Sequence, residues 1–169
     1  MTPVFQTKVD KDHGNCMQAA FASLFDLKLE DVPNFIELGD KWFSEMYSFV
    51  KTQGYEYETM LHNKVYSTLT TPTHECFNKV HWHRPSIMTP KCLYREQGIH
   101  GYFFATVLSP KYFNWHSGSA SCHAVIIDRH FNVVHDVSPE YQNILSYPLS
   151  KILGYNGVIN VYIINPIKS

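Results

Sequence analysis

The sequence predicts an α+β fold in which an N-terminal helical half packs on a C-terminal antiparallel β-sheet. Small and apolar residues recur at helical spacing up to about residue 53, and β-rich runs bounded by turn residues dominate the later part. Helices followed by a meander of antiparallel strands favour α+β over a parallel sheet, in which helices and strands alternate. The 169 residues contain no internal repeat, low-complexity tract or Gly/Ser linker, so we expect a single domain over residues 1–169.

The first predicted helix begins at Cys16 and ends near Phe25. Apolar or small residues recur along one side of it, at Met17, Ala20, Phe21 and Leu24. Its three alanines and one serine allow other elements to approach closely, as a central helix requires. Pro33 biases Val32 away from helical geometry, so we expect the helical segment to be broken there.

The second predicted helix runs from about Asp40 to Gln53. Its expected inward-facing residues are Trp42, Phe43, Met46, Phe49 and Val50. Gly54 is the expected stop, because glycine commonly follows the last turn of a helix. These two helices make up the predicted helical half.

The predicted strands occupy most of the remaining chain. The main β-rich runs are 101–108, 122–128, 131–136 and 157–164, and shorter strand-like pieces occur at 55–61 and 64–69. A tight turn near Asp128 would join the second and third main runs into a hairpin. We therefore expect these two runs to be neighbours in the sheet.

Composition excludes several classes of function. The formal net charge is −1, which gives no general reason to expect nucleic acid or an acidic membrane surface as a partner. No apolar run is long enough to span a bilayer, and the first six residues do not resemble a signal peptide. Four scattered cysteines do not make a disulfide framework in a chain of this size, so we expect a reduced, cytoplasmic protein.

Cys16 is the candidate nucleophile. It follows Gly14-Asn15, which can act as a turn and a helix cap, and so stands in the first turn of the predicted helix. The positive end of the helix dipole stabilises a thiolate over a thiol at this position. The alternative is a buried structural cysteine, since free cysteines are often buried as small hydrophobic residues.

His123 and Asp136 are the candidate base and its orienting acid. His123 opens one apolar run and Asp136 ends the next. In a hairpin the end of the second strand lies beside the start of the first, so the carboxylate can reach the imidazole. It would then fix the tautomer of the ring and stabilise its charged form. With ten histidines in the chain, His123 can also be a core or edge residue with no catalytic role.

The order of these segments resembles the papain-like cysteine hydrolase superfamily, above all small bacterial and phage papain-like proteins of unassigned function. The matching segments are 15–24, 32–35, His123-Ala124-Val125 and 134–139. The resemblance implies a papain-like fold with the nucleophile on a central helix, and the roles of nucleophile, base and orienter for Cys16, His123 and Asp136. It also implies a protein or peptide substrate and no cofactor or metal.

The oxyanion site departs from the papain-like pattern. Those enzymes usually carry a glutamine about half a dozen residues before the nucleophile, where this chain has Asp10 and Lys11. The nearest upstream glutamine is Gln6, which a longer loop can still bring to the site, and Asn15 is a second candidate donor. The loss of one oxyanion donor typically adds on the order of 3 kcal/mol to the barrier.

The function expected from the sequence is hydrolysis or acyl transfer at an amide, isopeptide or glutamine side-chain bond, through a thioester on Cys16. The alternative is a catalytically weak papain-like binding or inhibitory module, phage-encoded and directed at a host protein. A metal-dependent hydrolase is a third reading. Five residues carry side chains that are suitable zinc donors, but their spacing fits no standard zinc motif. They are His74, Cys76, His81, His83 and Cys92.

Three further residues are candidates for the rim of a substrate site. His13 lies too close to Cys16 in sequence to be oriented easily as a base, so we place it at the rim. Trp115 and His116 lie in a Ser- and Gly-containing stretch, 109–121, that precedes His123. This stretch is either a substrate-facing lip or a solvated connector.

Overall fold

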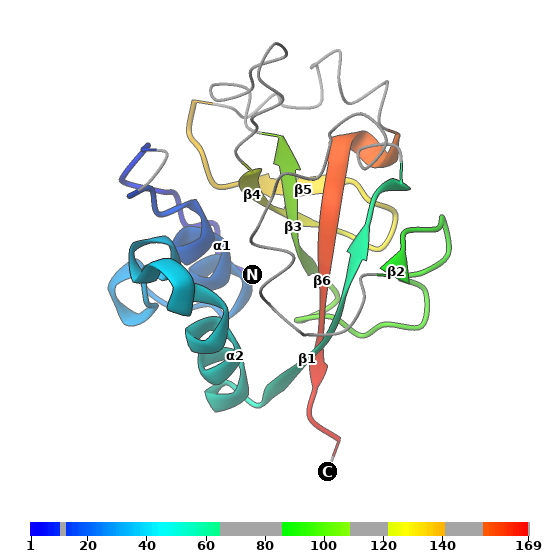
Figure 1. The fold of residues 1–169 in the computed structure, drawn as a ribbon, viewed down its shortest axis with the longest axis horizontal. Coiled ribbons are helices and arrows are strands. Elements are labelled where there is room, and N and C mark those ends of the chain that lie inside the picture. The colour runs from blue at the N-terminus through cyan, green and yellow to red at the C-terminus, as the bar shows by residue number, and fades with distance from the viewer. Residues whose placement is uncertain (11–12, 65–85, 109–121, 141–153, 169) are drawn as a thin grey trace.

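The computed structural model describes residues 1–10, 13–64, 86–108, 122–140 and 154–168. Within these ranges, helices α1 (Cys16–Leu24) and α2 (Trp42–Thr52) lie on one side of a six-stranded, largely antiparallel sheet (Figure 1). The predicted α+β class is therefore confirmed. None of the helices in the described ranges is long and apolar enough to cross a membrane.

Helix α1 is the central helix that its small side chains predict. All its residues from Met17 to Leu24 are buried except Gln18, and three alanines among them are fully buried. Ser23 contacts the N-terminal segment, because its Oγ accepts a hydrogen bond from the backbone N–H of Val4 at 2.8 Å. The helix therefore packs between that segment and the sheet.

Short 3-10 helices connect α1 to α2. They are η1 (Leu29–Asp31) and η2 (Phe35–Lys41), and Val32 between them is extended, as the following proline predicts. Gln18 of α1 holds this connection, since its Nε2 donates to the carbonyls of Leu29 at 2.9 Å and Val32 at 2.7 Å. Helix α2 ends at Thr52, two residues before Gly54. Gly54 has a φ of +81°, a conformation that favours glycine, and the chain enters β1 directly after it.

The strands of the sheet follow the order β2-β1-β6-β3-β4-β5. All neighbours are antiparallel except the short parallel pair β1–β2. The strands are β1 (Tyr55–His62), β2 (Ser86–Ile87), β3 (Phe103–Leu108), β4 (Cys122–Ile127), β5 (Val133–Asp136) and β6 (Val158–Pro166). The predicted piece at 64–69 lies almost wholly outside the described residues.

Strand β6 lies in the middle of the sheet, which corrects the expected meander. Strands β3, β4 and β5 do form a meander, but β6 inserts between β1 and β3 (Figure 1). Every residue from Val158 to Asn165 is buried. A strand that is apolar on both faces is covered best at the centre of a sheet, where both of its edges are also paired.

The β4–β5 hairpin forms where the sequence predicts it. Asp128 closes the turn, because its Oδ1 accepts hydrogen bonds from the backbone N–H groups of His130 at 2.8 Å and Asn132 at 3.0 Å. The register places Asp136 opposite Val125. The end of β5 therefore lies two residues from His123, near the start of β4.

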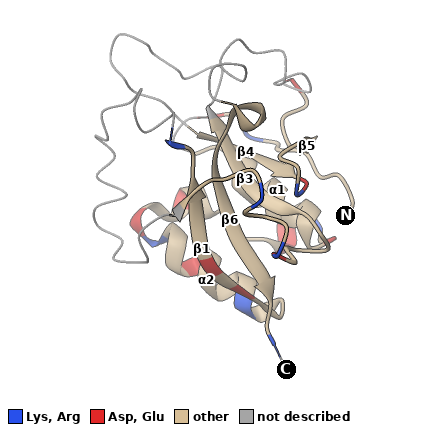
Figure 2. Ribbon diagram, turned by 90° about the vertical axis from the view of Figure 1, so that its right-hand side faces the viewer, with Lys and Arg blue, Asp and Glu red and all other residues tan. Residues whose placement is uncertain are grey.

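Charged side chains are excluded from the middle of the sheet. Strands β3, β4 and β6 carry no Lys, Arg, Asp or Glu, and in Figure 2 the coloured residues lie along α2, β1 and the turns. Buried apolar residues cover both faces, with Phe21 and Phe104 on the helix side and Phe103 and Phe131 on the other. A charged side chain near the start of β4, such as protonated His123, is therefore surrounded mainly by apolar residues.

Candidate active site

Cys16 stands at the first position of α1, with a half-buried side chain. The first turn of the helix contains no acidic residue that would offset the positive end of its dipole. The backbone N–H of Ala19 bonds to the carbonyl of Asn15 at 3.0 Å, which starts the helix at this point. The thiol therefore lies where a helix favours negative charge.

His123 and Asp136 form a buried hydrogen-bonded pair. The imidazole Nε2 lies 2.7 Å from Asp136 Oδ1, and the two residues are only 6% and 8% exposed. The same carboxylate oxygen accepts a hydrogen bond from the backbone N–H of Ser138 at 2.9 Å, which fixes its orientation. A carboxylate held in this way also fixes the ring that it binds.

The electrostatics connect this pair to Cys16. Burial alone lowers the pKa of His123, but hydrogen bonds to Asp136 and to Cys16, together with the charges of both groups, outweigh it and raise the pKa to about 9. Because Nε2 is bound to Asp136, Nδ1 is the ring nitrogen that remains for the thiol. The structure thus brings the three residues singled out in the sequence into one chain of contacts.

Gln6 lies close to Asp136, at the end of this series of residues that is away from Cys16. Its backbone N–H donates to the carbonyl of Val137 at 2.8 Å, one residue beyond Asp136, and the residue is only 7% exposed. The described residues between Gln6 and Cys16, 7–10 and 13–15, belong to no helix or strand and form a loop. Gly14 is required in that loop, because a Cβ at this position would collide with the backbone carbonyl of Asp10.

Asn15 closes the same loop with its side chain. Its Oδ1 accepts hydrogen bonds from the backbone N–H groups of Thr7 at 3.0 Å and Lys8 at 2.9 Å. Its Nδ2 donates to Thr7 Oγ1 at 3.0 Å and to Gln18 Oε1 at 3.2 Å. Both hydrogens of the amide are therefore engaged, so Asn15 positions the segment that follows Gln6 rather than offering a donor to a substrate.

Of the remaining rim candidates from the sequence, the structure describes His13, which does not join the site. His13 is exposed, and its Nδ1 lies 3.4 Å from Asp10 Oδ1. Trp115 and His116 lie outside the described residues, as do four of the five proposed zinc donors, His74, Cys76, His81 and His83. Within the described part of the chain, no group of three or more His, Cys, Asp or Glu side chains is placed to hold a metal ion.

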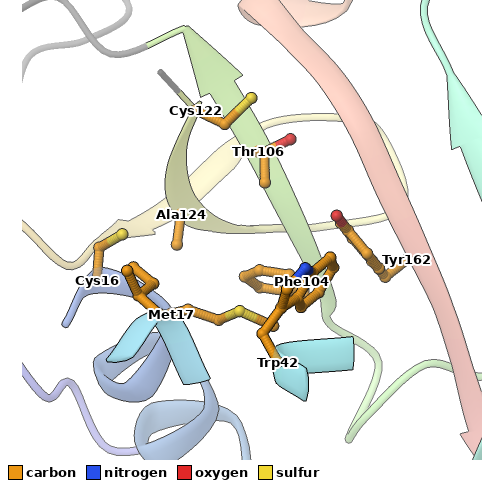
Figure 3. A pocket seen from close by; sticks show the side chains of 9 residues that line it. Cys16, Met17, Trp42, Phe104, Thr106, Cys122, Ala124 and Tyr162 are labelled. Carbon is orange, nitrogen blue, oxygen red and sulfur yellow. The ribbon is translucent and has the colours of Figure 1, made fainter. Parts of the chain in front are cut away.

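A pocket of about 260 Å³ opens beside Cys16, between the helices and the sheet (Figure 3). It is lined by Cys16, Met17, Ile36, Trp42, Phe104, Thr106, Cys122, Ala124 and Tyr162. Sequence reasoning missed most of these residues, because aromatic and β-branched residues in apolar runs are typical of core packing. Only the fold shows that β3 and β6 bring them next to the thiol.

The arrangement supplies the parts of nucleophilic catalysis by a thiol. A cysteine at a helix N-terminus raises the pKa of an imidazole, and a buried carboxylate orients that imidazole. The adjacent pocket offers space for a group attached to the reacting carbonyl. No family model, curated protein or solved structure matches this chain.

Proposed function

We propose that this protein is a papain-like cysteine hydrolase or acyl transferase that acts on an amide, isopeptide or glutamine side-chain bond. The observation that carries the proposal is the buried 2.7 Å contact between His123 and Asp136, with Cys16 among the groups that raise the pKa of the same imidazole. A structural histidine needs only one satisfied partner. A ring held between a carboxylate and a thiol at a helix N-terminus is instead typical of an activated nucleophile.

The proposed reaction passes through a thioester. The Cys16 thiolate attacks the carbonyl carbon, and the imidazolium of His123 gives its proton to the leaving amine as the C–N bond breaks. Water or an acceptor amine then attacks the thioester, His123 takes its proton, and the released thiolate is paired again with the imidazolium. Asp136 holds the ring orientation throughout and stabilises its charged form.

The oxyanion of the tetrahedral intermediate needs hydrogen-bond donors close to Cys16. The backbone N–H of Cys16 is one, because the first N–H groups of a helix have no acceptor within the helix. The side-chain amide of Gln6 is the proposed second donor. Its support is the position of Gln6 next to Val137, which the hydrogen bonds of Asn15 to the following two residues help to maintain.

The first test is the alkylation of Cys16 by iodoacetamide at about pH 6.5, where an ordinary thiol is mostly protonated. Cys16 is expected to react faster than Cys122, although Cys122 is the more exposed thiol. The reason is that the His123 imidazolium stabilises the Cys16 thiolate. Mass spectrometry of the digested protein gives the rate at each cysteine, and His123→Ala should abolish the advantage of Cys16.

A matched control comes from the neighbouring strand. His135 is also a buried histidine, 8% exposed, but its Nε2 contacts the carbonyl of Val4 at 3.0 Å. His135→Ala should leave the advantage of Cys16 in place. If Cys16 and Cys122 react alike in the parent, or if His123→Ala changes nothing, the enzyme proposal is wrong and the chain is better pursued as a papain-like binding module.

A further inference from the structure

The lining of the pocket beside Cys16 changes from mainly apolar to polar with distance from the thiol. Figure 3 shows the Cys16 thiol at one end and the Tyr162 hydroxyl at the other, with Met17 and Ala124 between them. Apolar side chains dominate the lining between them, with the indole nitrogen of Trp42 beside Phe104. Tyr162 and Thr106 come from the neighbouring strands β6 and β3 on the side away from Cys16, so the tip of a group that fills the pocket meets their two hydroxyls.

A row of hydrogen bonds across the sheet orients the Thr106 hydroxyl. The side chains of His62, Asn160 and Thr106 lie opposite one another on β1, β6 and β3. Asn160 Nδ2 donates to Thr106 Oγ1 at 3.1 Å, and His62 Nδ1 lies 2.7 Å from Asn160 Oδ1. Because an amide oxygen can only accept, His62 Nδ1 donates, and each bond in the row points toward the pocket. Thr106 accepts at its oxygen and keeps its hydroxyl hydrogen for donation.

Asn160 is buried, so its side chain needs the hydrogen bonds of this row to offset the loss of water. Asn160 is 2% exposed and stands in the central strand among Val and Ile residues. An amide buried there destabilises the fold unless its donor and its acceptor are both bonded, as they are here. The central strand thus carries a polar side chain whose hydrogen bonds end at the pocket.

Tyr162 supplies a second donor. Burial raises the pKa of its phenol well above the ordinary value, and the nearby Cys122 and Tyr57 raise it further, so the hydroxyl keeps its hydrogen. The pocket is lined by no Lys, Arg, Asp or Glu among the described residues. A carboxylate tip or an ammonium tip would therefore be buried without an opposite charge, whereas an uncharged carbonyl accepts from both hydroxyls without that cost.

We propose that the pocket selects an acyl group or side chain with an apolar stem and an uncharged carbonyl tip, such as a carboxamide, which Thr106 and Tyr162 bind by donation. The proposal rests on the proposed function for the step at Cys16, and it names the substrate group that this step accepts. A purely alkyl group fills the same space but leaves both donors unpaired, so it binds less well.

The test uses p-nitrophenyl esters of equal chain length that end in methyl, carboxamide, carboxylate or ammonium. The Cys16 thiolate attacks the ester carbonyl, the acyl group becomes a thioester, and p-nitrophenolate leaves and is measured. The carboxamide ester is expected to acylate Cys16 roughly tenfold faster than the methyl ester, as one or two neutral hydrogen bonds imply. A charged-tip ester reacting fastest overturns the proposal.

Variants of the two donors provide the decisive comparison. Thr106→Val and Tyr162→Phe should each lower the carboxamide-to-methyl ratio, and the double variant should bring it close to one, whereas Thr106→Ser, which keeps a hydroxyl, should preserve it. Because the ratio compares two probes on the same protein, a general loss of reactivity or folding cancels. An unchanged ratio in both Thr106→Val and Tyr162→Phe contradicts the proposal.

A binding measurement separates this proposal from the proposed function. Cys16→Ala removes the nucleophile, and NMR titration of that protein with hexanamide, hexanoate and hexylamine reports the preference of the pocket alone. Hexanamide should bind most tightly, and more weakly after Tyr162→Phe is added. If no ester acylates the parent but this order holds, the catalytic proposal fails and the pocket proposal stands, whereas tighter binding of hexanoate or hexylamine overturns the latter.

Discussion

His123 keeps its proton because of its two partners, and in spite of its burial. Removal from water favours the neutral ring, while Asp136 on one side and Cys16 on the other favour the charged ring, and the balance raises the pKa to about 9. The imidazolium that the proposed reaction needs as an acid is therefore already present in the resting protein. Asp136 contributes to this state twice, by its hydrogen bond and by its charge.

This balance predicts a pH dependence of stability. The folded-state pKa of about 9 lies above the ordinary value of 6.5, so protonated His123 stabilises the fold fully below about pH 6.5. That contribution is lost as the pH rises through about 9, and it amounts to roughly 3 kcal/mol. Urea unfolding of the parent across this range should show the decline. His123→Gln should lack it, and an identical decline in both proteins would contradict the assignment.

At the scale of the element, the loop before α1 decides where Gln6 lies. Its closure depends on the side chain of Asn15 and on the close approach of the Asp10 carbonyl to Gly14. The backbone N–H of Asn15 also donates to the carbonyl of Lys8 at 3.2 Å. These contacts tie the N-terminal segment to the start of the helix that carries Cys16.

Gly14→Ala should therefore disturb both stability and the site. The added Cβ would collide with backbone, which cannot rotate away as a side chain can, so we expect a loss of about 1–3 kcal/mol in the free energy of unfolding. Val9→Ala is the control in the same loop, because Val9 is 37% exposed and should change stability by less than about 0.5 kcal/mol. Equal denaturation midpoints for the two variants would show that the loop tolerates the Cβ.

Local patterns predicted the elements well, because each depends on near neighbours in sequence. The limits of α1 follow from apolar spacing between Cys16 and Pro33, and the β4–β5 turn follows from Asp128, whose carboxylate bonds to the two backbone groups that close it. The proximity of His123 and Asp136 follows from that hairpin alone. The position of β6 in the sheet cannot be inferred from local patterns, because strand order depends on contacts between residues more than fifty positions apart.

The pocket was missed for the same reason. Phe104, Thr106 and Tyr162 belong to strands that read only as apolar core, and their position beside Cys16 arises from the pairing of β3 with β6. The importance of Asn160 is likewise invisible in the sequence, since a single amide in an apolar strand gives no indication of its partners. Nearby residues pointed to Cys16, His123 and Asp136 as candidates, but long-range strand pairing determines what surrounds them.

At the scale of the whole molecule, β6 is the strand that joins two parts of the sheet, since no other strand pairing links them within the described residues. Strands β1 and β2 pair only with each other and with β6, while β3, β4 and β5 form the other part. A chain that stops after Gly157 should therefore not fold cooperatively. Circular dichroism during thermal unfolding should show no sharp transition, whereas a chain that stops after Ile167 should keep one. A cooperative transition in the shorter chain would show that the two parts fold without β6.

The central place of β6 also determines when the proposed site is complete during synthesis. Cys16 belongs to the first described helix, His123 and Asp136 follow more than a hundred residues later, and β6 comes last among the described elements. Until β6 has left the ribosome, the strands on either side of it cannot join, and the pocket lacks the wall that Tyr162 provides. The order of elements along the chain thus delays the assembly of the pocket and of the proposed catalytic residues until the late strands have been made.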